Sequence, residues 1–513
     1  MDITLDRSSE TPLYRQVHAG IGGRIRSGDL TPGAKLPSVR SLARTLRVSP
    51  ITVVQAYNAL AAEGLIGASP GRGTFVRTPS DDGGGADPAL RQTGEFSGGP
   101  ESRDEWQSSM PVYLRAPRIA AMQSLLRPGR RSGMISLAGG TPDPGLFPLR
   151  SLGRLWSRVM ALEDPRFLQY GTPQGDFHLR SWIAERSASM GITARPEDIL
   201  VTSGSQQAID LIARTFVGPG DYVLVESPTF ITALDILEGR GAKLLSVPLE
   251  AEGPRVDQIA SLIERYRPRL MYTIPTGHNP TGITMAEERR RQLASLARRH
   301  NLLILEDDSC SEFAYDADAP PAVKAFDAGG HVALVVSFSK TVIPGLRVGC
   351  VIAHGPLMAR LAESKSLGDR FTSPLIQRTL WRYLSAPQYM RDLTGARETY
   401  RRRRDALLRT LKEVMPAGVK WTHPAAGFNL WLHLPDGIRA AEAFEEGLKE
   451  GVACALGDLF LPHEPPPAGL RISFADNPEE VAAEGVRRLA RAIARLISRV
   501  DRGEQEAEFV TTV

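Results

Sequence analysis

The chain of 513 residues exceeds the size of one ordinary domain, so two or three domains are expected. Hydrophobic residues make up 42% and charged residues 23% of it, which excludes a disordered or fibrous chain and predicts buried cores. The net charge of +4 is unevenly placed, because residues 1–79 carry ten basic and five acidic residues and the remaining 434 residues carry a net −1. This basic excess favours nucleic acid over a membrane as the partner of the N-terminal segment.

The cysteines and the first residues indicate the cellular compartment. Cys310, Cys350 and Cys454 lie far apart and form no CxxC pair, which argues against a disulfide framework or a zinc site. The first ten residues lack the apolar stretch of a secretory signal, and no apolar run is long enough to span a bilayer. We therefore expect a cytoplasmic protein with no metal site and no membrane contact.

The first 79 residues predict three short helices followed by a hairpin. Apolar residues recur once per turn from Leu13 to Ile25, and a second helix is expected from about Ser38 to Leu46. Ser49, followed by a proline, is a good N-cap residue for the third helix. The short gap between the second and third helices is typical of a helix-turn-helix, and the segment LIGASPGRGTFV predicts two strands around a turn, a wing.

This segment carries the candidate DNA contacts, which are Arg40, Arg44, Ser49, Thr52, Gln55 and Arg72. By helical spacing Thr52 and Gln55 point outward from the third helix, which can lie in the major groove, so they are the candidate base readers. Arg40 and Arg44 are one turn apart and can reach phosphates, and Arg72 can reach the minor groove or the backbone. The alternative is a small helical domain with ordinary surface arginines.

After these residues a family resemblance is visible. KLPSVRSLARTLRVSPITVVQAYNALAAEGLI, followed by GRGTFV, resembles the GntR family of winged helix-turn-helix regulators over about 65 residues. The resemblance implies binding to a double-stranded DNA operator. Pro50 stands where the family usually has an arginine, so the base contact of that position and the operator sequence do not carry over.

Downstream, the composition changes twice. Residues 80–111 are rich in Gly, Ser, Asp and Pro and predict a flexible linker that spans roughly 30 Å. Residues 112–500 alternate apolar strands with amphipathic helices, which predicts an α/β domain with a mostly parallel sheet. The expected strands are DILVTS, DYVLVES, LMYTIP, LLILEDD and VALVVSFS.

The C-terminal part of this domain is expected to form a smaller α+β subdomain over about residues 390–500. It begins with a long charged helix that contains the run Arg401–Arg404, which we interpret as a solvated helix face. Residues 501–513 are expected to be a disordered tail.

Four motifs each follow an expected strand, and ligands of open α/β sheets bind beyond the carboxyl ends of strands. Ser203–Gln206 opens a helix, whose N-terminus can bind phosphate, although Ser-Gly is also a common turn. Asn279 opens an Asn-Pro turn and can donate to a phenolate oxygen, and Asp307 needs a cationic partner, which a pyridinium or a structural ion pair supplies. Lys340 can form a Schiff base and Arg347 can clamp a phosphate, although a lone lysine after a strand is usually a surface residue.

Together, SFSKTVIPGLRVG, HNPTG and ILEDD resemble the fold-type I aminotransferases that use pyridoxal 5′-phosphate, from about residue 112 to residue 499. The resemblance implies that Lys340 forms the Schiff base, Asp307 pairs with the pyridine nitrogen and Asn279 bonds the ring O3′. It implies a phosphate site at Gly204, Ser205, Gln206, Ser337, Ser339 and Arg347, with Phe230 stacked on the ring and Tyr170 reaching the phosphate from the partner subunit. It also implies a substrate carboxylate at Arg471, near Gly139 and Gly140.

One departure concerns the residues after ILEDD. Ser309 and Cys310 stand where fused regulators usually have Tyr-Asp, so the tyrosine that helps to set the O3′ hydrogen bond is absent. Ser309 can reach the ring O3′ only through a water.

The order of a GntR-type module, a linker and an aminotransferase-like domain resembles the MocR-type regulators. This implies a homodimer in which an amino compound, bearing a carboxylate for Arg471, forms an external aldimine at Lys340 and shifts the DNA-binding modules. Two alternatives stay open: a working aminotransferase that carries a DNA-binding domain, and a regulator for which the cofactor itself is the signal. The effector and the direction of regulation are not readable from the sequence.

Overall fold

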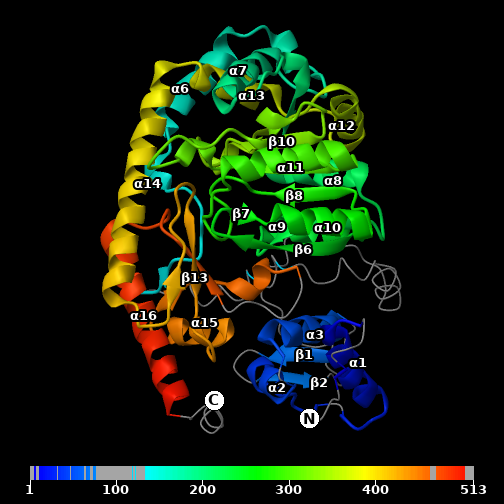
Figure 1. Ribbon diagram of the computed structural model, residues 1–513, viewed down its shortest axis with the longest axis vertical. Coiled ribbons are helices and arrows are strands. Elements are labelled where there is room, and N and C mark those ends of the chain that lie inside the picture. The colour runs from blue at the N-terminus through cyan, green and yellow to red at the C-terminus, as the bar shows by residue number, and fades with distance from the viewer. Residues whose placement is uncertain are drawn as a thin grey trace. The chain divides into compact units, whose positions relative to one another are not determined.

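The computed structural model describes residues 5–6, 11–31, 33–46, 48–62, 65–69, 73–76, 118, 122, 133–462 and 469–502 (Figure 1). The chain divides into two compact units, Met1–Leu125 and Leu126–Val513. The predicted linker 80–111, Arg72 and residues 503–513 of the predicted tail lie outside the described residues, and so does the side chain of Arg40.

The N-terminal unit has the predicted order of three helices and a hairpin. Its elements are α1 (Leu13–Arg26), α2 (Val39–Leu46), α3 (Pro50–Ala62), β1 (Ile66–Ser69) and β2 (Gly73–Val76). The buried core joins one face of each helix to the antiparallel hairpin, with Ile21, Leu42 and Leu60 fully enclosed. The glycines of α1 do not break it, and buried Gly22 faces Leu60, where a bare Cα lets α1 and α3 approach closely.

The second unit is an α/β domain with an added small subdomain. Its helices are α6 (Leu149–Leu162), α7 (Phe177–Ser187), α8 (Ser205–Phe216), α9 (Ile231–Gly239), α10 (Val256–Tyr266), α11 (Glu287–His300), α12 (Gly355–Gly368), α13 (Pro374–Leu384), α14 (Pro387–Val414), α15 (Ala440–Lys449) and α16 (Glu479–Asp501). Its longer strands are β4 (Ile199–Thr202), β5 (Tyr222–Ser227), β6 (Lys243–Glu250), β8 (Leu270–Thr273), β9 (Leu303–Asp308), β10 (Val332–Ser337), β11 (Gly349–Ile352), β13 (Asn429–His433) and β16 (Gly469–Ser473). The two-residue strands are β3 (Ile135–Ser136), β7 (Gly253–Pro254), β12 (Lys420–Trp421), β14 (Val452–Ala453) and β15 (Ala455–Leu456).

The main sheet has the strand order β4-β11-β10-β9-β8-β5-β6-β7. All five expected strands are present, and the neighbours from β10 to β6 are parallel, while β11 lies antiparallel between β10 and β4. Neighbouring residues of a strand face opposite sides of the sheet: Val223 packs with α8, α9 and α12, and Leu224 packs with α10 and α11. Helices therefore cover both faces, as the near-continuous apolar strands predict.

The small subdomain holds the antiparallel sheet β12-β13-β16-β15. Figure 1 shows α14, in yellow, running along one side of the unit towards this sheet and α16. The interpretation of Arg401–Arg404 as a solvated face is wrong for its second half. Arg403 is buried and pairs with Asp143, and Arg404 is buried and pairs with Asp316, because α14 presents this part of its surface to loops of the large domain.

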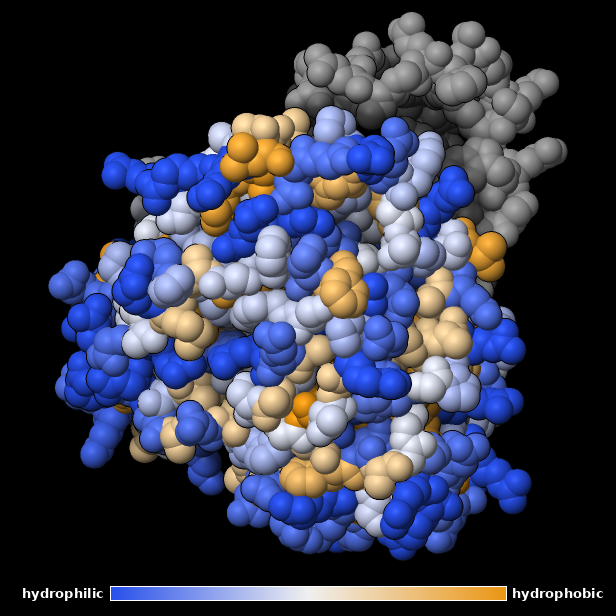
Figure 2. Space-filling view, turned by 90° about the horizontal axis from the view of Figure 1, so that it is seen from above, coloured by the Kyte–Doolittle hydropathy of each residue, from blue (hydrophilic) through white to orange (hydrophobic). Residues whose placement is uncertain are grey.

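The outer surface over α6, α7 and α13 is mostly hydrophilic, with small hydrophobic patches between the charged residues (Figure 2). Large apolar side chains contribute to the exposed surface of α6, among them Trp156, Met160 and Leu162. Within the part of the chain that the structure describes, none of the helices has the length and apolar character that a membrane crossing needs.

Candidate cofactor and DNA sites

The first motif forms a cradle at the N-terminus of α8. Gly204 precedes the helix with φ of 90° and offers no side-chain cap, so the N–H groups of Ser205 and Gln206 are left to a ligand. A Cβ on Gly204 would lie 2.7 Å from an Arg347 nitrogen, and a Cβ on Gly349 would lie 2.9 Å from the Ser205 nitrogen. Glycines at both positions thus keep Arg347 close to a helix N-terminus, which is a suitable arrangement for a phosphate.

Lys340 follows β10, at the same edge of the sheet. Its Nζ donates to the carbonyl of Gly140 at 2.7 Å and lies 5.7 Å from the centre of the Phe428 ring. Burial lowers the pKa of Lys340, and the positive charge of Arg471 lowers it further. Desolvation therefore favours the neutral amine, which is the form that attacks a carbonyl carbon.

Asp307 is buried near the end of β9 and is held at both oxygens. Tyr272 donates to Oδ2 at 2.8 Å, and Ser309 donates to Oδ1 at 3.0 Å. Burial raises the pKa of Asp307 to about 6, against the two hydrogen bonds, which favour the ionised form. Ser309 thus contacts Asp307 directly.

Arg471 in β16 lies over the Phe460 ring, with 5.0 Å between its Cζ and the ring centre. Its guanidinium donates to the carbonyls of Ala138 and Gly139 and, at 3.1 Å, to the side-chain oxygen of Asn279. Burial lowers its pKa to about 10, and its Nε has no hydrogen-bond partner among the described residues. The Lys340 loop thus contacts the segment around Gly139 directly, and the Asn279 turn is joined to it through Arg471.

That segment is fixed by Asp476, a residue that the sequence did not point to. Asp476 accepts hydrogen bonds from the backbone nitrogens of Gly140 at 3.1 Å and Thr141 at 3.0 Å. A Cβ on Gly139 would lie 1.8 Å from the Asp476 carboxylate, so only glycine fits there. The contact places the Gly140 carbonyl at Lys340.

Three other predicted residues lie at or just beyond the ends of the strands at this edge. Ser337 is buried and accepts a hydrogen bond from the backbone of Ser339 at 3.3 Å. Phe230 is the N-cap residue of α9 and is half-buried against the core. The backbone nitrogen of the preceding Thr229 donates to the carbonyl of Phe460, which joins the Phe230 loop to the ring beneath Arg471.

In the N-terminal unit, Ser49 caps α3 and accepts a hydrogen bond from the backbone of Thr52 at 3.1 Å. The prediction that Thr52 points outward is wrong. Its hydroxyl lies 3.0 Å from the Ser49 hydroxyl and its side chain is only 2% exposed, because the capping turn folds it back under the helix N-terminus. Gln55 is half-buried and Arg44 is exposed, so both stay candidate DNA contacts.

Two sequence families match the two units. Residues 13–76 match "Bacterial regulatory proteins, gntR family", and residues 134–489 match "Aminotransferase class I and II". The chain is 30% identical over 490 residues to the uncharacterized HTH-type transcriptional regulator YisV of Bacillus subtilis, covering 94% of this chain and 98% of the relative. It is 29% identical over 503 residues to the probable rhizopine catabolism regulatory protein MocR of Rhizobium meliloti, covering 97% of each.

The chain belongs to the MocR-type regulators. The larger unit of this MocR-type regulator is also similar to a solved enzyme, the α-aminoadipate aminotransferase LysN of Thermus thermophilus. The TM-score is 0.70 with 33% identity, covering 77% of this chain and 99% of the enzyme, which was solved with N-(5′-phosphopyridoxyl)-L-leucine. The predicted fold class is confirmed by these matches: a GntR helix-turn-helix and a fold-type I aminotransferase domain.

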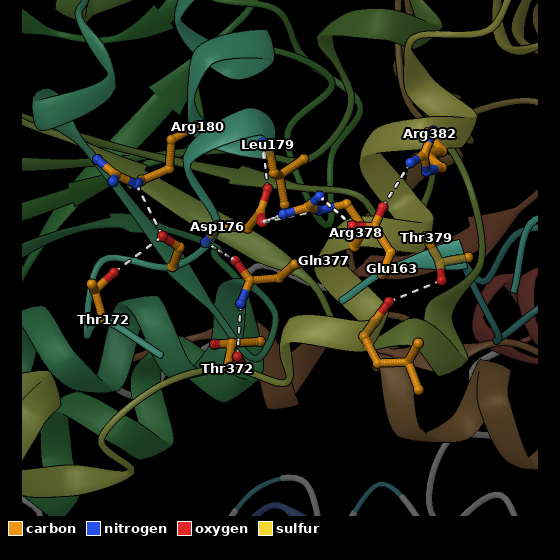
Figure 3. Close-up of polar contacts among 12 residues, drawn as sticks. Glu163, Thr172, Asp176, Leu179, Arg180, Thr372, Gln377, Arg378, Thr379 and Arg382 are labelled. Carbon is orange, nitrogen blue, oxygen red and sulfur yellow. Dashed lines mark hydrogen bonds and ion pairs between the residues drawn. The ribbon is translucent and has the colours of Figure 1, made fainter. Parts of the chain in front are cut away.

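Tyr170, which the sequence places at a cofactor phosphate, is 78% exposed in this regulator and meets the edge of Phe371. The segment that carries it is firmly anchored (Figure 3). Gln377 of α13 accepts from the Asp176 backbone and donates to the Thr372 carbonyl, both at 2.7 Å. Arg378 and Arg382 of α13 add ion pairs to the two ends of the segment, at Glu163 and Asp176. Tyr170 is therefore presented outward on a rigid support.

Sequence reasoning missed three residues of the site: the buried Tyr272 and Asn429 and the half-buried Asp476. Asp476 follows β16, so the rule that located the other motifs at strand ends would also have found it. Tyr272 and Asn429 gave no such signal. Tyr272 lies inside an apolar strand and reaches Asp307 only because β8 and β9 pair in parallel, with Tyr272 opposite Leu305.

Proposed function

We propose that this MocR-type regulator binds double-stranded DNA with its N-terminal unit and binds an amino compound at a pyridoxal 5′-phosphate site around Lys340. One observation carries the proposal. Lys340, Asp307 and Arg471 come from distant parts of the sequence, and desolvation shifts the pKa of each. Asp307 and Arg471 are buried, Lys340 is half-buried, and the side chains of Lys340 and Arg471 both donate to carbonyls of the Gly139–Gly140 segment. Such a set of perturbed groups is typical of a functional site rather than of a structural core.

The residues present fit pyridoxal 5′-phosphate. When bound, this cofactor supplies an aldehyde that condenses with a primary amine and a ring that withdraws electrons. The cradle of Gly204 and Arg347 suits the phosphate of the cofactor. Burial disfavours the negative charge of Asp307, so a positively charged pyridinium N–H is a suitable partner for this carboxylate. Lys340 supplies the amine, and Asn279, whose side-chain oxygen accepts from Arg471, has an amide N–H group that can donate to a phenolic oxygen.

Arg471 favours an amino compound that bears a carboxylate. Its Nε lacks a partner among the described residues, and two of its other contacts are to neutral backbone carbonyls, which a carboxylate can displace. Asp476 lies nearby, but it accepts from the backbone N–H groups of Gly140 and Thr141 and makes no ion pair with Arg471 among the described residues. An amino acid is the simplest ligand that serves both Arg471 and Lys340.

A signal requires a structural element whose hydrogen bonds differ between the ligand-free and the ligand-bound site. We propose the entry segment, residues 135–141, as that element. Its carbonyls at Ala138, Gly139 and Gly140 accept from Arg471 and Lys340, so a carboxylate at Arg471, or a new bond at the Lys340 nitrogen, removes hydrogen bonds that hold it. The segment also contains β3, the first strand of the second unit, on the side of the chain that leads to the DNA-binding unit.

We propose a homodimer in which Tyr170 serves the partner's site. An aromatic residue that is 78% exposed on an anchored segment supports a contact outside its own subunit. The exposed Trp156, Met160 and Leu162 of α6 support an apolar interface between the two subunits. Sedimentation of the full chain tests the assembly state.

The second candidate function is a working aminotransferase. It is favoured by the same observation, because Lys340 with a lowered pKa is suited to move a proton as well as to form a bond. In that case Lys340 transfers a proton at the ligand's α-carbon, and a keto acid accepts the amino group. The regulator is preferred because the chain carries a GntR module over residues 13–76.

The deciding experiment follows the visible absorption of the cofactor-loaded full chain. We expect a band in the wild type that is lost in Lys340→Ala and kept in Lys412→Ala, a matched change at an exposed lysine of α14. An amino acid that shifts the band and changes DNA affinity without keto-acid-dependent turnover supports the regulator. Steady turnover supports the aminotransferase, a response of DNA binding to the cofactor alone supports a cofactor sensor, and a band that survives in Lys340→Ala contradicts the cofactor site.

A further inference from the structure

Asn429 is a buried polar side chain whose amide oxygen the fold leaves unused. It is the first residue of β13 and lies directly opposite Ser473 of β16, while Trp431 lies opposite Arg471. Opposed residues of an antiparallel pair share one face of the sheet, so Asn429 and Arg471 are diagonal neighbours on that face. The side chain is only 6% exposed, yet its Oδ1 has no hydrogen-bond partner among the described residues.

An unpaired buried amide oxygen is costly, so a group retained in that state calls for a ligand or an ordered water. Its surroundings favour a ligand. A Cβ built on Gly140 would lie 2.9 Å from Asn429 Oδ1 and 3.7 Å from the guanidinium carbon of Arg471, so both side chains border the space that this glycine leaves open. The carbonyl of the same Gly140 accepts from Lys340 at 2.7 Å.

The unpaired atoms of these two neighbouring side chains have opposite hydrogen-bonding character. Arg471 Nε is a donor and is satisfied by a ligand carboxylate, whereas Asn429 Oδ1 is an acceptor, which a carboxylate cannot satisfy. The ligand's amino group is used at Lys340. A further donor on the ligand is therefore needed, and it must lie close to the amino group because Gly140 borders Lys340, Arg471 and Asn429 alike.

We infer that Asn429 is a specificity-determining residue, which selects amino acids with a short side chain that carries a hydroxyl or amino donor. The inference rests on the proposed function, since it places the ligand between Lys340 and Arg471. It narrows the class of effector from carboxylate-bearing amino compounds in general to those with a donor on the β- or γ-carbon.

The test compares pairs of amino acids that differ by a methyl-to-hydroxyl exchange: 2-aminobutyrate with serine, valine with threonine, and norvaline with homoserine. Dissociation constants are measured by calorimetry on the cofactor-loaded full chain, so the readout does not depend on turnover. We expect the wild type to prefer the hydroxyl member of at least one pair by about tenfold or more, because its apolar counterpart leaves Asn429 unpaired.

In Asn429→Leu, which keeps the branched heavy-atom skeleton of the side chain and removes the acceptor, that preference is expected to disappear through weaker binding of the hydroxyl member. Asn429→Ala removes the acceptor with a smaller side chain and serves if the leucine variant does not fold. Equal affinities in all three pairs, binding of none of the six amino acids, or a preference that survives in both variants would overturn the inference. Loss of the visible band in Lys340→Ala is scored separately, so failure of the proposed cofactor site is distinguished from failure of the Asn429 inference.

Discussion

At the scale of single residues, the site is built from polar groups whose ordinary charges are opposed by burial. Asp307 shows this opposition most directly. Its pKa is raised to about 6 by burial, while Tyr272 and Ser309 hold its ionised form by hydrogen bonds. The residue that stands in place of the family's usual tyrosine thus helps to keep Asp307 ionised near neutral pH. The effect of Ser309 on the pKa of Asp307 can be separated from the cofactor's own titration by comparing variants over a range of pH.

Removing the Ser309 hydroxyl should raise the pKa of Asp307 further, because the hydrogen bond favours the ionised carboxylate. A raised carboxyl pKa means that ionisation is lost at a higher pH. Binding of the cofactor needs the ionised carboxylate. As the pH is lowered, binding should therefore begin to weaken at a higher pH in Ser309→Ala than in the wild type. The dissociation constant of the cofactor against pH, by fluorescence quenching, measures the shift.

Ser309→Thr keeps the hydroxyl and should retain the wild-type pH profile. The cofactor's own titration is common to all three proteins and cancels in the comparison. Coincident acid limbs for Ser309→Ala and the wild type would show that this hydrogen bond does not tune Asp307.

At the scale of elements, α14 joins the two subdomains through ion pairs at its buried side. Arg402 and Arg403 are neighbours on this helix with opposite environments. The Arg402 side chain is 59% exposed and lies 3.8 Å from Glu479, whereas the Arg403 side chain is 9% exposed and bonds both Asp143 and the Ala475 carbonyl. Substituting each arginine in turn tests how much more the buried ion pair contributes to the free energy of unfolding than the exposed one.

Arg403→Ala should lower the free energy of unfolding of the second unit by about 2–3 kcal/mol. This is somewhat less than for a fully enclosed pair, because Asp143 keeps some access to water. Arg402→Ala should change it by less than about 0.5 kcal/mol. Urea unfolding followed by tryptophan fluorescence reports mainly on this unit, since five of the six tryptophans lie in it and the sixth, Trp106, lies in the predicted linker. Equal losses in the two variants would contradict the role assigned to the buried pair.

The sequence predicted the positions of strands and strand-end motifs, but not which polar residues are buried. The expected strands and the motifs at their ends were predictable, because apolar runs and strand-end loops are local signals. The burial of Arg403 and Thr52 was not, since each depends on what packs against it: a loop near Asp143 in one case and the Ser49 capping turn in the other. Asn429 was missed for the same reason, because its significance comes from Gly140 and Arg471, both far away in the sequence.

At the scale of the whole molecule, the DNA-binding unit and the ligand-binding unit must exchange free energy if the protein regulates. An amino acid that changes the DNA affinity by some factor must have its own affinity changed by DNA through the same factor, because the coupling free energy is shared. This equality is a property of the full chain and cannot be measured on either unit by itself.

We expect this equality for the full chain with a duplex selected from random sequences. DNA affinity is measured by fluorescence anisotropy with and without the amino acid, and amino-acid affinity by calorimetry with and without saturating DNA. Arg471→Gln should keep the visible cofactor band and lose both effects together. Two unequal factors, or an effect on DNA that persists in Arg471→Gln, would contradict coupling through this site.

The entry segment also has a mechanical consequence. Its two-residue strand β3 pairs in parallel with β14, and the next residues are held by Arg471 and Asp476. A pull applied at the N-terminal end of this segment therefore loads the short β3–β14 pairing in series with the contacts that we propose for the effector. Under the proposed function, we expect operators with differently spaced half-sites to set different effector thresholds for the same protein.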